Sequence, residues 1–393
     1  MRLAMIYKRN HWAHAMKLAA WGWRRKIGCM GESSLLQLHQ ALPTSGARRV
    51  APFEMDGALY LGVPQLAEDV AGTPAHMNGG NSDIDALLYR WDQGRFEEAE
   101  RICVPGGEDL AYFEAGTERY LVAASIRTGS GPYDLNAVST VFRRGVEGWH
   151  AHQAIETFAA KQCYPFTFAE RRFLGVAQGV TLAGLEARHP RQSCLLEWDG
   201  AAFRAFQTLE GRWGYGFCYF ELDGGSYLAY ADHTSDSLLY RWDGREFVPV
   251  QRFAAQGGRA FRFFRCDGGA CLASANISGE STLYGWNGSE FVAHQRLAGA
   301  GGRAWELCET SSGLYLIRIC FIEGTPAAPK TDLRSQIYRW EAGAFRVVEE
   351  FPTFGGTDAA VFTRDGQRYL AVANSLSAEV RFRQDTLIYR LQL

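Results

Sequence analysis

The stretch "SLLYRWDGREF", residues 237–247, contains the pattern on which the fold depends. Its side chains alternate with a period of two from Leu238 to Trp242, which indicates a β-strand. Asp243-Gly244 then predicts a two-residue type I′ turn, after which a second strand begins. An isolated hairpin is at best marginally stable in water, so this hairpin must pack against other strands.

Copies of this hairpin recur along the chain. The clear copies are "ALLYRWDQGRF" (86–96), "CLLEWDGAAF" (194–203), "TLYGWNGSEF" (282–291) and "QIYRWEAGAF" (336–345), and the weaker ones are "STVFRRGVEGW" (139–149) and "TLIYRLQL" (386–393). The tryptophan column falls at Trp91, Arg144, Trp198, Trp242, Trp286, Trp340 and Leu391, at spacings of 53, 54, 44, 44, 54 and 51 residues. Seven copies at such periods predict stacked four-stranded propeller blades, with Trp242 buried between two of them.

One blade can be read in full from the sequence. Its four expected strands are "RAFRFFRC" (259–266), "CLASAN" (271–276), "TLYGWN" (282–287) and "FVAHQRL" (291–297). The second strand of each copy is apolar on both faces, which is expected where sheets are covered on both sides. In a propeller each blade has a neighbour on each face, so the pattern fits.

The fourth strands carry a bulky residue, then Gln or Glu four positions later, then an apolar residue. These triplets are Phe247/Gln251/Phe253, Phe291/Gln295/Leu297, Phe203/Gln207/Leu209, Trp149/Gln153/Ile155, Phe96/Glu100/Ile102 and Phe345/Glu349/Phe351. There are only six, so the seventh must come from the N-terminal "LLQLHQAL" (35–42), which has Leu36, Gln40 and Leu42 in the same spacing. We therefore predict an all-β, closed seven-bladed propeller over residues 34–393, with 35–42 pairing with 386–392.

The net charge and hydropathy of the sequence bear on the classes of partner that can be expected. The chain has 393 residues and a formal net charge of −2, so nothing favours nucleic acid or an anionic membrane as a partner. No run of about 18 apolar residues occurs, so no transmembrane segment is expected. Residues 1–33 match no repeat and are interpreted as a poorly ordered or helical leader. The propeller itself is expected to be monomeric.

Nine cysteines are scattered along the chain without metal-ligand spacing. The favoured interpretation is reduced, buried thiols in a cytoplasmic protein. Cys266 and Cys271 flank the turn "DGGA" and are the pair that a hairpin could bring together.

The repeat phrase, with "YLAVAN" on the second strand and "S-x-LY-x-W-x-G-x-x-F" on the third and fourth, resembles the epitempin repeat, also called the EAR or EPTP repeat. The resemblance covers residues 35–393 and is weakest in the second blade, where Arg144 replaces Trp. It implies a seven-bladed propeller with a role in protein recognition. The best-known members are secreted neuronal ligands of the leucine-rich glioma-inactivated group, which bind disintegrin-type receptors. The sequence shows neither their leucine-rich-repeat half nor a clear secretory signal, so this partner does not carry over.

Counting along the first strands predicts one residue per blade at the mouth of the central channel. These residues are Arg49, Asp109, Gln162, Gly216, Ala260, Ala304 and Asp358, and their preceding neighbours include Arg48, Glu108, Lys161, Arg259 and Arg303. Three interpretations stay open for this cluster: a structural ion-pair network, a calcium site, and an active or ligand site whose arginines clamp an anion. Arg49 between two carboxylates argues against calcium, so no cofactor is expected.

Loops between second and third strands are long in five blades, and such insertions often build a binding surface. The longest are residues 64–85, 178–193 and 321–335. Their polar residues, candidates for contact with a partner, are His76, Asp83, Tyr133, Asp134, His189, Arg191 and Lys330. No nucleotide-binding, zinc-protease or serine-hydrolase motif occurs. The sequence thus favours a non-enzymatic propeller that recognises a protein or peptide through its loop face; the alternative is an enzyme or binder of a polar or anionic small molecule at the channel mouth.

Overall fold

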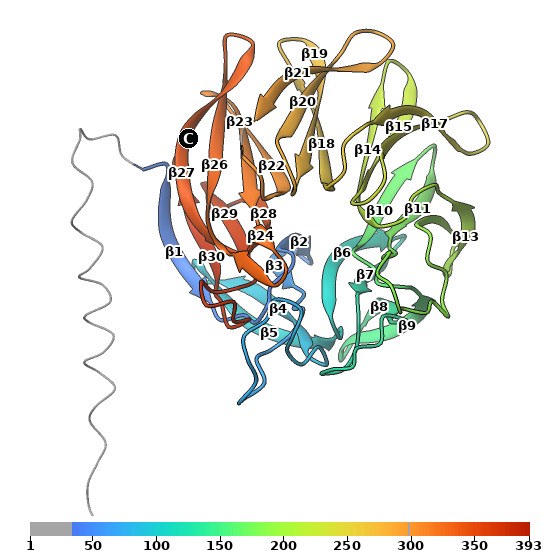
Figure 1. Cartoon of the computed structure of the whole chain (residues 1–393), viewed down its shortest axis with the longest axis vertical. Coiled ribbons are helices and arrows are strands. Elements are labelled where there is room, and N and C mark those ends of the chain that lie inside the picture. The colour runs from blue at the N-terminus through green and yellow to red at the C-terminus, as the bar shows by residue number, and fades with distance from the viewer. Residues whose placement is uncertain (1–33, 298) are drawn as a thin grey trace, which may run out of the picture. The chain divides into compact units, whose positions relative to one another are not determined.

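Seven four-stranded antiparallel sheets stand around a central axis in the computed structural model, which describes residues 34–297 and 299–393 (Figure 1). The predicted closed seven-bladed propeller is confirmed. No helix in these residues is long and apolar enough to cross a membrane. The proposed leader, residues 1–33, lies outside the described part of the chain.

The strands follow one another from the axis outward in each blade. Blade 1 contains β2 (Ala51–Met55), β3 (Ala58–Val63), β4 (Asp85–Asp92) and β5 (Arg95–Cys103); blade 2 contains β6 (Gly107–Ala115), β7 (Glu118–Ser125), β8 (Val138–Gly145) and β9 (Gly148–Glu156). Blade 3 contains β10 (Gln162–Phe168), β11 (Arg171–Ala177), β12 (Cys194–Trp198) and β13 (Phe203–Thr208); blade 4 contains β14 (Gly214–Leu222), β15 (Gly225–Asp232), β16 (Ser237–Trp242) and β17 (Phe247–Phe253).

The second half of the ring repeats this order. Blade 5 contains β18 (Gly258–Cys266), β19 (Gly269–Asn276), β20 (Ser281–Trp286) and β21 (Phe291–Leu297); blade 6 contains β22 (Gly302–Thr310), β23 (Gly313–Cys320), β26 (Asp332–Glu341) and β27 (Ala344–Phe354). Blade 7 contains β28 (Gly356–Arg364), β29 (Gln367–Asn374), β30 (Thr386–Leu391) and β1 (Leu36–Leu42), and a small hairpin of β24 (Glu323–Thr325) and β25 (Ala328–Lys330) projects from blade 6.

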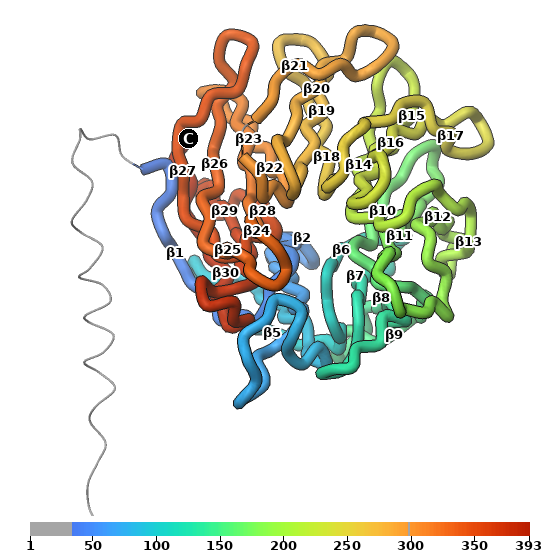
Figure 2. Tube along the Cα trace, in the orientation of Figure 1, coloured from blue at the N-terminus to red at the C-terminus, as the bar shows by residue number. Residues whose placement is uncertain are grey.

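Both ends of the described chain close the ring in blade 7. Strand β1 pairs antiparallel with β30, from Leu36 opposite Leu391 to Leu42 opposite Thr386, as predicted. Figure 2 shows the blue β1 beside the red C-terminal strands. Because the last blade is completed by the first strand, no blade is left with three strands and its third strand as an open outer edge.

The turns of the hairpins differ from the expectation in one respect. The turn after Trp242 has four residues, and the Asp243 carboxylate accepts hydrogen bonds from the backbone N–H groups of Arg245 (2.8 Å) and Glu246 (2.9 Å). The predicted two-residue type I′ turn at this position is therefore wrong. Two-residue turns with positive φ at both positions instead join first and second strands, as at Asp223-Gly224.

A glutamine on five of the seven fourth strands bridges to the next blade. Gln251 donates from Nε2 to the carbonyl oxygen of Phe291 (2.6 Å) and accepts from the Phe291 N–H (2.9 Å). The same two-way bridge joins Gln40 to Phe96, Gln153 to Phe203, Gln207 to Phe247 and Gln295 to Phe345. We call this contact the glutamine bridge. It explains the glutamine of the repeat phrase, since only a side-chain amide both donates and accepts in this way.

A β-bulge precedes each bridging glutamine. In blade 4, Leu239 pairs with Gln251 while Tyr240 pairs with Pro249, so Val250 has no partner in the ladder. The other third-to-fourth strand pairs show the same shift. Because a bulge changes the face to which the following side chain points, it aims the glutamine at the neighbouring blade.

The second blade departs from the repeat because its bridge is ionic. Glu100 of blade 1 accepts from the Trp149 N–H (2.8 Å), but a carboxylate has no proton to donate to the carbonyl. Arg144 instead donates to the Glu100 carboxylate at 2.7 Å and balances its charge. The Arg in the tryptophan column of blade 2 thus pairs with the Glu that replaces Gln at this junction, whereas the second Glu at this fourth-strand position, Glu349, accepts from the Leu35 N–H (2.6 Å).

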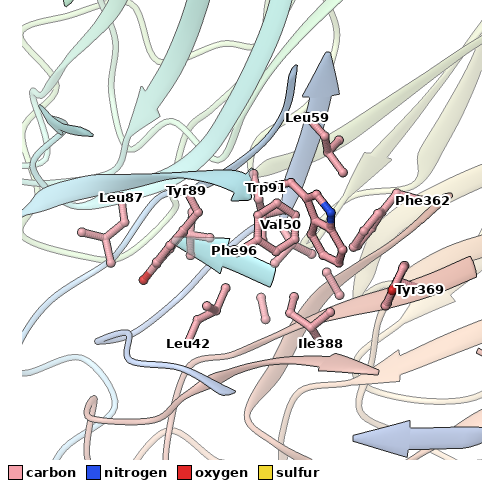
Figure 3. Packing of buried hydrophobic residues seen from close by; sticks show 14 of the residues in the cluster. Leu42, Val50, Leu59, Leu87, Tyr89, Trp91, Phe96, Phe362, Tyr369 and Ile388 are labelled. Carbon is pink, nitrogen blue, oxygen red and sulfur yellow. The ribbon is translucent and has the colours of Figure 1, made fainter. Parts of the chain in front are cut away.

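The tryptophan column is less buried than expected. Trp91 is 7% exposed and packs between Phe96 and Phe362 at the junction of blades 1 and 7 (Figure 3). Trp242, however, is only half-buried, which corrects the expected burial. Three members of the column donate to an aspartate of the preceding blade: Trp91 Nε1 to Asp365 (3.3 Å), Trp286 Nε1 to Asp223 (2.9 Å) and Trp340 Nε1 to Asp267 (2.8 Å).

One pair of cysteines is oxidised. Cys266 and Cys271 form a disulfide across the turn between β18 and β19, which corrects the expectation that the thiols are reduced. The other six cysteines within the described ranges are free.

We predict that Gln251→Glu lowers the free energy of unfolding by about 1–3 kcal/mol, because the carboxylate loses the donor and faces the Phe291 carbonyl. Gln256→Glu, at an exposed position of the same blade, should change it by less than about 0.5 kcal/mol. Urea unfolding followed by tryptophan fluorescence measures both, and equal effects would show that the bridge adds nothing.

Candidate functional site

The first strands of all seven blades surround a central cavity of about 570 Å³. It is lined by all seven residues predicted for the channel mouth and by their five named neighbours, including Arg49, Asp109, Gln162, Arg259, Arg303 and Asp358. These residues precede or begin the first strands, so the sevenfold repeat alone brings together positions that lie about 50 residues apart in sequence.

The end of the cavity nearest the long loops is ringed by cations. The positions just before the predicted channel residues hold Arg48, Lys161, Arg259 and Arg303, together with Glu108 and Tyr215. We call the four basic side chains the cation ring. Arg48, Lys161 and Arg259 are only 8%, 6% and 9% exposed. Four buried cations thus share one acidic residue of the same layer.

That acid neutralises only part of the ring. Glu108 lies 3.4 Å from both Arg48 Nε and Arg303 Nη2. Lys161 donates to the carbonyl oxygen of Ala159 (2.7 Å), and Arg259 stacks 3.8 Å over the Tyr215 ring. Within residues 34–297 and 299–393, neither Lys161 nor Arg259 forms an ion pair, so cation–π contact and neutral carbonyls are their main compensation.

Burial shifts the pKa values of side chains in the cation ring. Desolvation lowers the pKa of Lys161 to about 7, and the positive charges of Arg303, Arg259 and Arg48 act in the same direction against the attraction of Glu108. Desolvation likewise lowers the pKa of Arg259 to about 10. Charged forms are therefore costly in this layer.

A second layer contains the acidic pair predicted from the sequence. Arg49 Nη1 donates to Asp109 Oδ1 (2.7 Å), and its Nε lies 4.0 Å from Asp358 Oδ2. Asp109 also accepts from the Cys163 N–H (3.0 Å). Burial raises the pKa of Asp358 to about 6.

This layer does not fit calcium. Both oxygens of Asp109 already accept hydrogen bonds, and the Arg49 guanidinium lies where a cation would need to contact both carboxylates. Calcium requires six to eight oxygen ligands. The described residues contain no group of three or more His, Cys, Asp or Glu side chains with a metal-binding arrangement.

Solvent reaches the cavity mainly from the end remote from the loops. The side chains of Arg48 and Lys161 are buried, whereas those of Arg49 and Arg262, further along the first strands, are 32% and 39% exposed. On the loop side, the ring of Phe321 covers the guanidinium groups of Arg48 (5.5 Å) and Arg303 (5.9 Å). The cation ring therefore forms the inner end of the cavity.

Sequence reasoning missed several residues of the cavity, among them Glu306, Arg262 and Tyr215. Glu306 pairs with Arg262 (3.2 Å), and burial raises the pKa of Glu306 to about 7. Tyr215 contributes the aromatic face under Arg259. All three occupy columns of the first strand that the repeat alignment defines, so scanning every column for polar or aromatic outliers would have found them.

The predicted loop residues fall into two groups. Five of them hold loops in place: Asp83 accepts from the Gly129 N–H, Tyr133 donates to Gly80, Asp134 pairs with Arg188, His189 Nδ1 lies 2.9 Å from the Thr157 carbonyl oxygen, and Arg191 donates to Val180. His76 and Lys330 are exposed instead. We call the layer formed by residues 64–84, 126–137, 178–193, 321–331 and 375–385 the loop surface.

Comparison with known proteins identifies the repeat. The family model described as "EPTP domain" matches residues 202–243 and 344–392. A mouse "Thrombospondin-type laminin G domain and EAR repeat-containing protein" is 32% identical over 95 residues, and its human counterpart is 30% identical over 94 residues. These matches cover 24% and 23% of this chain but only 13% of each relative.

A solved structure supports the fold alone. A putative 6-phosphogluconolactonase from Bacteroides uniformis superposes with a TM-score of 0.54 at 16% sequence identity. The superposition covers 77% of this chain and 88% of that one.

We predict that Lys161→Met raises the free energy of unfolding by about 3–5 kcal/mol at pH 6, with a gain that shrinks toward pH 10. The folded-state pKa of about 7 lies below the ordinary 10.5, so the wild type loses stability as the pH falls from 10.5 to 7 and stays at that lower level below it. Methionine has no charge to bury. Urea unfolding at pH 6, 8 and 10 measures this.

Lys330→Met is the matched control, because Lys330 is exposed on the loop surface. It should change the free energy of unfolding by less than about 0.5 kcal/mol at every pH. A pH-independent gain for Lys161→Met, or a loss, would show that Lys161 is stably charged and well compensated.

Proposed function

We propose that this propeller of EPTP repeats is a non-enzymatic binding module that recognises a protein or peptide through its loop surface. The observation that carries the proposal is the bracing of this surface. Loops of neighbouring blades hold one another by side-chain hydrogen bonds, although each loop alone would be a long, irregular segment.

The bracing runs across several blade junctions. Between blades 7 and 1, Arg381 Nη1 donates to the Thr73 carbonyl oxygen (3.0 Å) and Asp69 accepts from the Arg383 N–H (3.1 Å). Between blades 6 and 7, Thr331 Oγ1 donates to the Ser377 carbonyl oxygen (2.7 Å). The loops are thus held to one another as well as to their own blades.

Blades 1 and 2 are joined by Arg127. It donates to the carbonyl oxygens of Asn78 (2.6 Å) and Gly79 (2.6 Å), and its guanidinium stacks 3.7 Å over the Tyr133 ring. A buried arginine that spans two loops fixes their relative positions.

A surface that is ordered before binding loses less conformational entropy on association. The braced loops leave exposed side chains available for contact, among them His76, Lys330 and Leu182, which is 56% exposed. An exposed apolar side chain beside polar ones is typical of a recognition surface. The EPTP matches support the same role, since the repeat is associated with protein recognition.

The test is a binding comparison between two faces of the disc. Protein or peptide ligands are selected with the wild-type propeller and then measured against Lys330→Glu and Leu182→Asp on the loop surface. Arg245→Glu, in the exposed turn between β16 and β17, changes charge at the opposite ends of the strands and serves as the control.

We expect at least a tenfold loss of affinity for one or both loop-surface variants, because both side chains are exposed on the loop surface, and wild-type affinity for Arg245→Glu. Circular dichroism should show unchanged folding for all three. Selected ligands that bind both loop-surface variants at full affinity would place recognition elsewhere.

A further inference from the structure

We propose that the cation ring binds a small divalent oxyanion, the phosphate or dicarboxylate head of a polar small molecule. This inference concerns the central cavity and stands independently of recognition at the loop surface. It rests on the charge, the open donor positions and the space at the inner end of the cavity.

The first observation is the net positive charge of the cation ring. The ring contains Arg48, Lys161, Arg259 and Arg303, and its one acid, Glu108, leaves an excess of two arginine charges and a third positive charge when Lys161 is protonated. Buried charges are costly unless they are paired. A doubly charged anion would neutralise most of this excess and would form charge-assisted hydrogen bonds with several donors at once.

Open donors are the second observation. Arg48 Nε is buried, lies 3.4 Å from Glu108 and makes no hydrogen bond within the described part of the chain. Within the described residues, Lys161 and Arg259 each donate to one backbone carbonyl, although an ammonium has three donors and a guanidinium five. Three side chains that are at least nine-tenths buried therefore have unused hydrogen-bond donors around the same cavity.

The third observation is space beside these donors. The next layer has large polar side chains in four blades, namely Asp358, Arg49, Asp109 and Gln162, but only Gly216, Ala260 and Ala304 in blades 4 to 6. These small residues directly follow Tyr215, Arg259 and Arg303. The cavity is therefore roomiest next to Arg259, the guanidinium of the ring that forms no ion pair within the described residues.

The remainder of the ligand would meet a polar wall. Gln162 Oε1 accepts from the Phe217 N–H (2.7 Å), which leaves its Nε2 as a donor on the cavity wall. Asp358 and Glu306, whose ionisation is disfavoured by burial, line the same space. Such groups suit hydroxyl-bearing molecules, and a volume of about 570 Å³ is in the range of small-molecule sites.

The experiment measures thermal unfolding and isothermal titration calorimetry with inorganic phosphate and with succinate. Ionic strength is held constant with sodium chloride, so that non-specific screening is equal in all samples. We expect a saturable rise in Tm of several degrees with at least one of the two anions. A response to phosphate alone assigns a phosphate head group, and a response to succinate alone assigns a dicarboxylate.

Lys161→Met and Arg259→Gln should each weaken the affinity for the active anion at least tenfold. Since Lys161→Met is expected to be the more stable protein, loss of its response cannot be ascribed to unfolding. Arg204→Gln, an exposed arginine on the outer strand β13, is the control and should respond like the wild type.

Two results would overturn the proposal: a Tm that follows ionic strength alone for both anions, or a saturable response that survives in Lys161→Met and Arg259→Gln. Lys330→Glu on the loop surface should keep the full anion response. Failure at the cation ring is thereby distinguished from failure of recognition at the loop surface.

Discussion

The whole ring depends on one constraint: each fourth strand must satisfy the backbone of the next blade at its first bulky residue. A backbone N–H and C=O of the same residue can both be satisfied by a primary amide, which donates and accepts within one side chain. Five junctions use Gln in this way, as Gln251 does with Phe291. Where Glu100 occupies the position, its carboxylate still accepts from the Trp149 N–H, and Arg144 donates to the same carboxylate. The contact thus explains both the repeat phrase and its departure in blade 2.

A ring closed in this way fixes the first strands around the axis, and the function of the cavity then depends on what each blade places there. Repeat positions that hold the same type of residue in most blades form the sheets and their packing. The positions that face the axis differ from blade to blade, as Arg48, Glu108 and Tyr215 show. Variation among structurally equivalent positions produces a cavity with a cationic inner end and one roomy side. The same division holds at the loop face, where insertions of different length are tied together by side chains such as Arg127.

The sequence predicted the fold because its repeats reflect how the blades pack. The seven copies, the second strands that are apolar on both faces and the last blade shared by both chain ends all follow from blades stacked in a closed ring. The sequence also located the cavity residues, since counting along a repeat transfers from one blade to the next. The sequence-based predictions were wrong or incomplete where the result depends on contacts between particular side chains. The turn at Asp243 follows from side-chain capping, and the half-exposure of Trp242 follows from its place near the rim. That Asp83 and His189 brace loops depends on partners far away in sequence, which no local pattern reveals.

The most direct test of the central role of the inter-blade bridge is a double-mutant cycle at its ionic version. Glu100→Gln and Arg144→Trp together convert this junction to the arrangement found elsewhere in the ring, whereas each change alone leaves a mismatched partner. Unfolding in urea should show that the single variants are less stable than the wild type, and that the double variant recovers stability with a coupling energy of about 1–2 kcal/mol. Additivity of the two changes within about 0.3–0.5 kcal/mol would contradict the account, because it would show that the two positions do not act as one bridge.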